Sequence, residues 1–436
     1  MALSFVRLIA YPGLLPARSF VLYTLFAAFI AITSALSNIG LPELLFESLK
    51  YRKRGHSSAL NATVVISVLV ALFVMGAILY LKEEIVSAMF DSIVLSQRTW
   101  VCVAMLSATS ILSLCSSALV KSSDHEFAFP VLLSIKSLPP LIFIIAYSLT
   151  GLRRVMPSDL VVDWLLFIEA IACVAQFIYA LFLLGDNRSS TVAQVSSGYL
   201  SLERPQKWPT QFYRFLLQTY PKCFAHYLSS ILLPLLQNFE KLILFRFLSS
   251  ALYQDYAYFS SLFSIAQASY NSYLQMATYR LANLRLVCHS PQLLFSAINR
   301  PPYYPDILIA AISSLAFILI GMLVNSSALL APFPSLGVHV PAFLSPSSVA
   351  PAAIASLSLP ILALNYYSYL TGSFHRISLD SIISLMPSSV LACAAMVLMK
   401  SIIAYAIVFL LTRLPLSLAI YFPNLNMAKI VSTRSR

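Results

Sequence analysis

The sequence predicts an all-α polytopic membrane protein, with eleven or twelve transmembrane helices arranged as two pseudo-symmetric six-helix bundles. Hydrophobic residues make up 59% of the 436 positions and charged residues only 10%, well below the roughly 25% charged residues of soluble domains. The apolar residues form runs long enough to cross a membrane as helices, and they lack the period-2 alternation of barrel strands. One of these runs is repeated in the second half of the chain.

Eleven apolar runs account for the predicted spans. Most have about the 20 residues that a membrane-spanning helix needs. The two longest, 307–338 and 340–374, contain prolines, and each is expected to hold one span plus a loop. The runs are 20–42, 59–81, 99–120, 127–150, 160–184, 211–237, 252–280, 307–338, 340–374, 377–398 and 401–421.

A short apolar segment at residues 2–10 precedes the first run. No small-residue cleavage pattern follows it, so we do not interpret it as a signal peptide. It is expected to be a short or truncated first helix. The six cysteines are scattered without paired spacing and are expected to pack inside the bundles.

The basic residues predict the orientation. If the loop after run 20–42 lies inside, sixteen Lys and Arg residues fall in inside loops and the C-terminal tail, and eight fall outside. This asymmetry follows the positive-inside rule and predicts a cytoplasmic C-terminus. The net charge of +12 is then explained by topology and by attraction to anionic headgroups, so no nucleic-acid partner is expected.

The longest polar stretch divides the chain into two halves. Residues 185–210 are rich in Ser and Pro and are predicted to form a cytoplasmic linker. An N-terminal bundle, 1–184, would precede it, and a C-terminal bundle, 211–436, would follow.

An internal repeat relates the halves. A shift of 233 positions aligns FVLYTLFAAFIAITSALSNIGL (20–41) with YQDYAYFSSLFSIAQASYNSYL (253–274) without a gap. Six of 22 positions are identical, among them Tyr23 with Tyr256 and Phe26 with Phe259. Copies that run in the same direction are typical of transporters whose halves are related by an axis along the membrane normal.

Both copies of the repeat lead into a basic inside loop, KYRKRG in the first half and YRLANLR in the second. In the first, Glu43 and Glu47 share a helix face and Glu47 can meet Lys50 at i+3. We interpret Glu43, Glu47, Lys50, Arg52 and Arg54 as half of a two-fold cytoplasmic gate. The basic run also anchors the topology and could receive an anionic headgroup.

Two stretches resemble a known family. Residues 8–55, which begin LIAYPGLLPARSF, and residues 232–266, LLPLLQNFEKLILFRFLSSALYQDYAYFSSLFSIA, resemble corresponding stretches of bacterial polysaccharide and O-antigen flippases. These belong to the multidrug/oligosaccharidyl-lipid/polysaccharide exporter superfamily. Glu240 and Lys241 match the acidic-basic pair of the family, whereas Arg246, Ser249 and Ser250 replace its usual glycines.

The resemblance implies alternating-access transport across the bacterial inner membrane. The substrate would be an undecaprenyl-diphosphate-linked oligosaccharide for cell-surface polysaccharide synthesis. Membrane lipids, a polysaccharide polymerase and a chain-length protein would be partners. The alternatives are an ion-coupled multidrug or small-molecule exporter of the same superfamily, and a membrane polysaccharide polymerase or ligase.

A flippase for such a substrate needs cations in a polar cavity. Lys136 lies near the middle of run 127–150, just before Pro139 and Pro140, and Lys222 follows Pro221 in run 211–237. A charge there is costly unless it faces a cavity or an anion, although snorkelling of a long side chain is the alternative. Arg280 is expected to meet either the substrate phosphate or lipid headgroups.

Other polar residues within the runs have two interpretations each. Glu169 could bind Na⁺ or a proton, or form an ion pair with Lys136, which we favour. Asn271, Gln275 and Thr278 form a stripe that suits either sugar hydroxyls or hydrogen bonds between helices. Tyr256, Phe259 and Phe263 have helical spacing and are expected to pack or to lie at the membrane interface.

No enzyme signature is present. None of the six histidines has a nucleophile or a metal ligand at a suitable spacing, and the sequence contains no GxxxxGK[ST] phosphate loop. We therefore expect no enzymatic activity and no cofactor beyond a coupling ion, Na⁺ or H⁺. A polymerase or ligase would be expected to have a long outside loop, whereas those at 82–98 and 332–348 are short.

Overall fold

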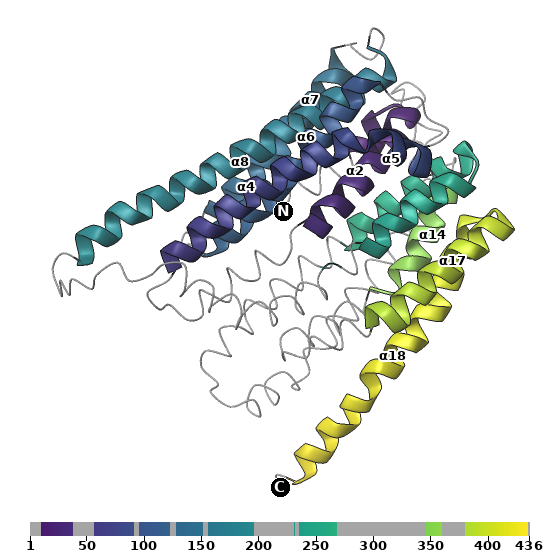
Figure 1. Cartoon of the computed structure of the whole chain (residues 1–436). Coiled ribbons are helices and arrows are strands. Elements are labelled where there is room, and N and C mark those ends of the chain that lie inside the picture. The colour runs from purple at the N-terminus through teal and green to yellow at the C-terminus, as the bar shows by residue number, and fades with distance from the viewer. Residues whose placement is uncertain are drawn as a thin grey trace, which may run out of the picture. The chain divides into compact units, whose positions relative to one another are not determined.

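The computed structural model is helical throughout its regular structure (Figure 1). It describes residues 10–37, 56–90, 96–122, 128–150, 156–195, 231, 235–267, 345–359 and 380–434. The predicted all-α class is confirmed. Two compact units divide the chain: residues 18–242 with 1–7, and residues 243–436 with 8–17.

The first unit contains six described helices with assigned bounds. The long helix α6 packs along α4 and α8, and α7 packs along α8 (Figure 1). The short helix α5 follows α4 directly. The bounds are α2 (Ala17–Ser37), α4 (His56–Tyr80), α5 (Lys82–Met89), α6 (Gln97–Ser122), α7 (Ala128–Leu149) and α8 (Ser158–Val195).

The second unit is organised around its last helix. Residues 250–267 form a helix. The π-helical turn η4 and helices α14 and α17 pack against α18, and Lys400, in the left-handed region at φ 49°, reverses the chain between α17 and α18. The bounds are α14 (Pro346–Ser356), η4 (Asp380–Leu385), α17 (Met386–Met399) and α18 (Ile402–Arg434).

Six of the described helices are long and apolar enough to span a membrane. Residues 402–417 form a shorter apolar helix. These seven segments match the predicted runs from 20–42 to 160–184 and the last two runs. Runs 211–237 and 307–338 lie almost entirely outside the described residues. The spans are Ala17–Ser37, Thr63–Tyr80, Gln97–Ser117, Val131–Leu149, Asp159–Leu183 and Ile382–Met399.

The predicted linker at 185–210 is only partly described. Helix α8 continues to Val195, and residues 196–210 lie outside the described part. The boundary between the two compact units lies after the predicted linker, between Leu242 and Ile243. The linker and the bundle boundaries of the sequence therefore stay predictions.

The internal repeat is visible in the backbone. A helical turn at 10–14 is interrupted at Leu15 and Pro16 before α2, and a helix at 235–247 is interrupted at 248–249 before helix 250–267. The two interruptions coincide under the shift of 233 positions. Equivalent hydrogen bonds precede them, from the Leu15 amide to the Tyr11 carbonyl at 3.1 Å and from the Leu248 amide to the Leu244 carbonyl at 3.0 Å. Equal backbone geometry at aligned positions supports the parallel duplication.

Four aromatic rings hold the predicted outer end of the first unit together. Phe90 lies 5.7 Å from Phe26, 6.3 Å from Phe29 and 5.9 Å from Trp100, measured between ring centroids. Such tilted and edge-to-face pairs are favourable contacts. The cluster joins α2 to α6 through the residue that follows α5.

Removing the Phe90 ring should destabilise this unit. We expect Phe90→Ala to lower the free energy of unfolding by about 3 kcal/mol, because the fully buried ring would leave a cavity. Thermal unfolding of the detergent-purified protein measures this change. The control Phe182→Ala, at a ring that is 72% exposed on α8, should change it little. Equal effects of the two substitutions would contradict this assignment.

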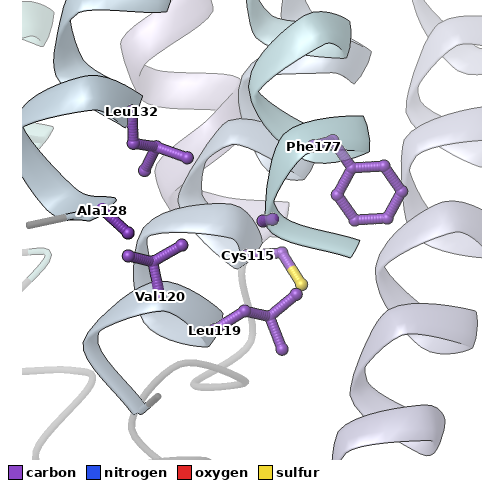
Figure 2. Packing of buried hydrophobic residues seen from close by; sticks show 7 residues of the cluster. Cys115, Leu119, Val120, Ala128, Leu132 and Phe177 are labelled. Atoms are coloured by element: carbon purple, nitrogen blue, oxygen red, sulfur yellow. The ribbon is translucent and has the colours of Figure 1, made fainter. Parts of the chain in front are cut away.

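A second apolar cluster lies toward the predicted inner end of the first unit (Figure 2). Leu119 and Val120 of α6 meet Leu132 of α7 and Phe177 of α8, with Cys115 between them. The cysteines at 102, 115 and 173 are all buried, as expected for packing residues. This cluster fixes α6, α7 and α8 beside the polar residues described next.

Candidate transport site

Lys136 is held inside the first unit by a polar contact. It lies about 12 Å along the helix axis from the start of α7, at 1.5 Å per residue, and its side chain is half-buried. Its ammonium donates a hydrogen bond to the Ser113 hydroxyl of α6 at 3.2 Å. The lysine therefore points toward the neighbouring helix at mid-depth.

A chain of hydrogen bonds extends from Lys136 across three helices. The Ser113 hydroxyl donates to Gln176 Oε1 at 2.6 Å, and Gln176 Nε2 donates to the Leu132 carbonyl at 2.6 Å. Ser113 and Gln176 are buried. Pro139 and Pro140 cannot donate the backbone hydrogen bonds that Ile135 and Lys136 would normally accept, so α7 is weakened beside the lysine. The network thus joins a charge, a polar relay and a weakened helix.

Glu169 of α8 is hydrogen-bonded to a different helix, α2. Its carboxylate is 6% exposed and accepts a hydrogen bond from the Tyr23 hydroxyl of α2 at 2.8 Å. Glu169 and Gln176 lie on the same face of α8, two turns apart. The structure thus gives Glu169 and Lys136 different hydrogen-bond partners, Tyr23 and Ser113.

Further charged residues gather at the predicted outer end of this unit. Arg18 lies 3.8 Å from the exposed Asp159, and such an exposed pair contributes little to stability. Asp163 is 5% exposed and lies beside Thr99. The Arg98 guanidinium lies 5.9 Å from the Trp164 ring centre.

An apolar groove lies between α7 and α8. Its volume is about 480 Å³ and almost no polar surface lines it. The groove is formed at small residues, because alanine and proline side chains leave space between α7 and α8. The walls include Ser134, Leu138 and Pro139 of α7 and Ile168, Ala172 and Ala175 of α8.

In the first unit Tyr23 contacts the acid Glu169, whereas its repeat partner in the second unit contacts aromatic residues. Tyr256, the repeat partner of Tyr23, packs against Tyr405 of α18, with 5.8 Å between ring centroids. Phe259 lies 5.6 Å from the same ring. These rings are buried, so the predicted packing role of Tyr256 and Phe259 is confirmed.

Most of the residues predicted for the site cannot be placed. Only Lys136 and Glu169 belong to the described part of the chain. The other ten lie outside the described residues, and their roles stay predictions. They are Lys222, Arg280, Asn271, Gln275 and Thr278 of the cavity and Glu43, Glu47, Lys50, Arg52 and Arg54 of the gate.

Several site residues were missed by sequence reasoning. Ser113, Gln176 and Tyr23 are common residues in membrane helices, so composition alone does not mark them. In the second unit, Arg413 of α18 is 3% exposed within the apolar segment 402–417, and it did carry a signal in the sequence. The inside and outside loops, the span ends and the tail together contain 24 of the 28 Lys and Arg residues. The four that belong to none of these are Arg413, Arg7, Lys136 and Lys222.

Comparisons with known proteins identify the fold. The sequence matches no protein-family model and no curated protein. A multidrug resistance MATE family transporter of the MOP superfamily, in its inward-facing conformation, aligns with 100% of this chain and 96% of its own, at TM-score 0.61 and 9% identity.

Two further solved structures agree. An outward-facing multidrug resistance MATE transporter aligns with 98% of this chain and 92% of its own, at TM-score 0.52 and 11% identity. A MOP superfamily transporter from Pyrococcus furiosus, described as having a binding pocket of reversed polarity, aligns with 99% of this chain and 93% of its own, at TM-score 0.54 and 10% identity. The chain therefore has the fold of MOP superfamily transporters.

Proposed function

We propose that this protein is an alternating-access transporter that flips a lipid-linked oligosaccharide, carried on undecaprenyl diphosphate, across the bacterial inner membrane. The fold is that of transporters, and the resemblance at residues 8–55 and 232–266 favours this branch. The protein would act with a polysaccharide polymerase and a chain-length protein in cell-surface polysaccharide synthesis. It would catalyse no covalent change.

The observation that supports the proposal most is the Lys136 network. A cation within the membrane is costly and marks a substrate or ion path. Here the ammonium donates to the Ser113 hydroxyl, which in turn donates to Gln176, beside the double proline of α7. Such a cation suits the diphosphate of a lipid carrier, because phosphate oxygens accept charge-assisted hydrogen bonds.

The apolar groove between α7 and α8 suits the lipid chain. Its residues belong to two candidate membrane spans and its lining is almost entirely apolar, as a hydrocarbon chain requires. We infer that it guides the carrier's isoprenoid chain while the headgroup crosses the polar interior.

Filling the groove should therefore slow flipping. We expect Ala175→Phe to lower the rate at least about fivefold, because the added ring would occupy the space between α7 and α8. The matched control Ile178→Phe adds bulk to the same helix at a position that is 61% exposed. Flipping rates in proteoliposomes measure both. Equal rates in the two variants would exclude the groove from the lipid path.

Multidrug export is the second candidate function. The solved transporters of this fold include multidrug resistance proteins, and the buried Glu169 could take up a coupling ion. A fluorescent lipid-linked oligosaccharide in proteoliposomes separates the candidates. Movement between leaflets without covalent change supports the flippase. Sugar transfer indicates a polymerase or ligase, and accumulation of a cationic dye without lipid movement indicates an exporter.

A further inference from the structure

Asp163 is a buried acid within a membrane span. It lies in the candidate span Asp159–Leu183 of α8 and is 5% exposed. One of its two carboxylate oxygens, Oδ1, is buried and has no hydrogen-bond partner in the part of the chain that the structure describes. Burying a carboxylate without pairing its oxygens is costly. Acids within membrane spans commonly mark an ion or proton path.

The surroundings of Asp163 favour a proton as its ligand. Thr99 of α6 lies beside the carboxylate. Within the described residues, the charged and titratable groups near it are Arg98 and Cys102 of α6 and Asp159 of α8. A metal ion needs several ligands, and the described residues contain no group of three or more His, Cys, Asp or Glu side chains that could hold one. A proton needs only the free oxygen.

Asp163 lies between an exposed acid and a deeper acid of the same helix. The Asp159 side chain, one turn earlier, is 58% exposed. Glu169 is 6% exposed and is hydrogen-bonded to Tyr23. At 1.5 Å per residue, Asp163 lies about 6 Å inward of Asp159 and about 9 Å outward of Glu169 along the helix axis. The three acids thus form a series that leads from the predicted outer end of α8 into the membrane.

A second polar group without a partner belongs to the neighbouring helix. α6 and α8 pack side by side (Figure 1). The Ser107 hydroxyl of α6 is buried, and no described residue forms a hydrogen bond with it. Along α6, Ser107 lies between Thr99 and Ser113, two residues whose side chains meet polar groups of α8. Buried polar groups without partners are rare and call for an explanation. A hydroxyl both donates and accepts hydrogen bonds, so it can pass on a proton.

We propose that Asp163 takes up protons from the outer solution and supplies them to Glu169. In the uptake step, a hydronium ion at the level of Asp159 gives its proton to Oδ1 of Asp163, so an O–H bond forms, the carboxyl becomes neutral and a water molecule remains. In the release step this bond breaks, the proton passes inward through water or the Ser107 hydroxyl to the Glu169 carboxylate, and Asp163 is ionised again. The use of these protons to drive a lipid-linked oligosaccharide rests on the proposed function.

The test uses two matched substitutions on α8. Asp163→Asn keeps the shape of the side chain and removes the proton site. Asp159→Asn removes an equal charge from an exposed position one turn away. The first measurement is the infrared spectrum of the purified protein during acidification, because protonated carboxyl groups give a separate C=O band. The second is the stimulation of flipping of a fluorescent lipid-linked oligosaccharide by a proton gradient in proteoliposomes.

We expect acidification of the wild-type protein to produce a protonated-carboxyl band that Asp163→Asn lacks and Asp159→Asn keeps. Asp163→Asn should also lower the gradient-driven flipping rate at least about tenfold, toward the undriven rate, because protons no longer reach Glu169. Asp163→Glu restores a carboxyl group and should regain part of the stimulation. The melting temperature of Asp163→Asn should stay within a few degrees of wild type.

The outcomes separate this site from the proposed function. An unchanged carboxyl band in Asp163→Asn overturns the proton site, and a wild-type response of this variant to the gradient overturns its role in uptake. If Asp163→Asn does not fold, wild-type protein with isotope-labelled aspartate decides, because a carboxyl band that does not shift with the label overturns the site. If the band belongs to Asp163 but no oligosaccharide moves, the proposed function fails and the proton site stands.

Discussion

Replacing Lys136 by alanine should abolish flipping and leave the protein folded. We expect the flipping rate to fall at least about a hundredfold, which corresponds to a transport barrier raised by about 2.7 kcal/mol. The reason is that Lys136 lies in the interior of a span of the N-terminal unit, on a hydrogen-bonded relay. Transport of a fluorescent lipid-linked oligosaccharide in proteoliposomes measures the effect.

The same substitution should cost little stability. Without the lysine, the Ser113 hydroxyl still donates to Gln176, and Gln176 still donates to the Leu132 carbonyl. No buried polar atom of the relay loses its only partner. Thermal unfolding should therefore match wild type.

Two controls distinguish charge from general disturbance. Lys136→Arg keeps the cation and should retain part of the rate, whereas Lys82→Ala removes a half-buried lysine of α5 that is not part of the relay and should have no effect. Wild-type flipping by Lys136→Ala would remove Lys136 from the transport path. A large loss of thermal stability would instead assign it a structural role.

The fold was predictable because the membrane imposes a strong pattern. A span must satisfy its backbone hydrogen bonds internally, so about 20 apolar residues in a row mean a helix. The repeat could also be recognised from the sequence, by six identical positions at a shift of 233. The structure has helix interruptions at 15–16 and 248–249, which coincide under the same shift.

The polar contacts were less predictable for a physical reason. Lys136 and Glu169 are charged residues in apolar runs, and each was therefore conspicuous. Their partners Ser113 and Tyr23 lie far away in the sequence, and only helix packing decides which hydroxyl meets which charge. An ion pair between Lys136 and Glu169 was the favoured expectation. In the structure the Lys136 ammonium donates to the Ser113 hydroxyl of α6 at 3.2 Å, and the Glu169 carboxylate accepts from the Tyr23 hydroxyl of α2 at 2.8 Å.

The Glu169 carboxylate should couple transport to an ion gradient. We expect Glu169→Gln to remove gradient stimulation, lowering the driven rate at least about tenfold toward the undriven one. The amide keeps an oxygen that can accept the hydrogen bond from the Tyr23 hydroxyl. The substitution therefore removes the titratable charge and preserves the local contact.

Rates measured with a proton gradient, and separately with a sodium gradient at constant pH, identify the ion. The exposed acids of α5 offer a control, because Glu83→Gln removes an equal charge outside the spans. Stimulation of Glu169→Gln by either gradient at the wild-type level would exclude Glu169 from coupling. Tyr23→Phe removes the hydrogen bond to the carboxylate and should keep the stimulation, because the carboxylate itself remains.

The internal repeat strengthens the expectation for Glu169. In the second unit Tyr256, the repeat partner of Tyr23, meets Tyr405 through ring contacts. The duplicated helix pair is thus held by aromatic packing in one unit and by a hydrogen bond to a carboxylate in the other. Aromatic rings make this contact in the second unit, so a carboxylate is not the only group that can serve at such a helix contact. The use of a buried acid in the first unit, where the second uses rings, is the reason we expect Glu169 to bind a coupling cation or proton during transport.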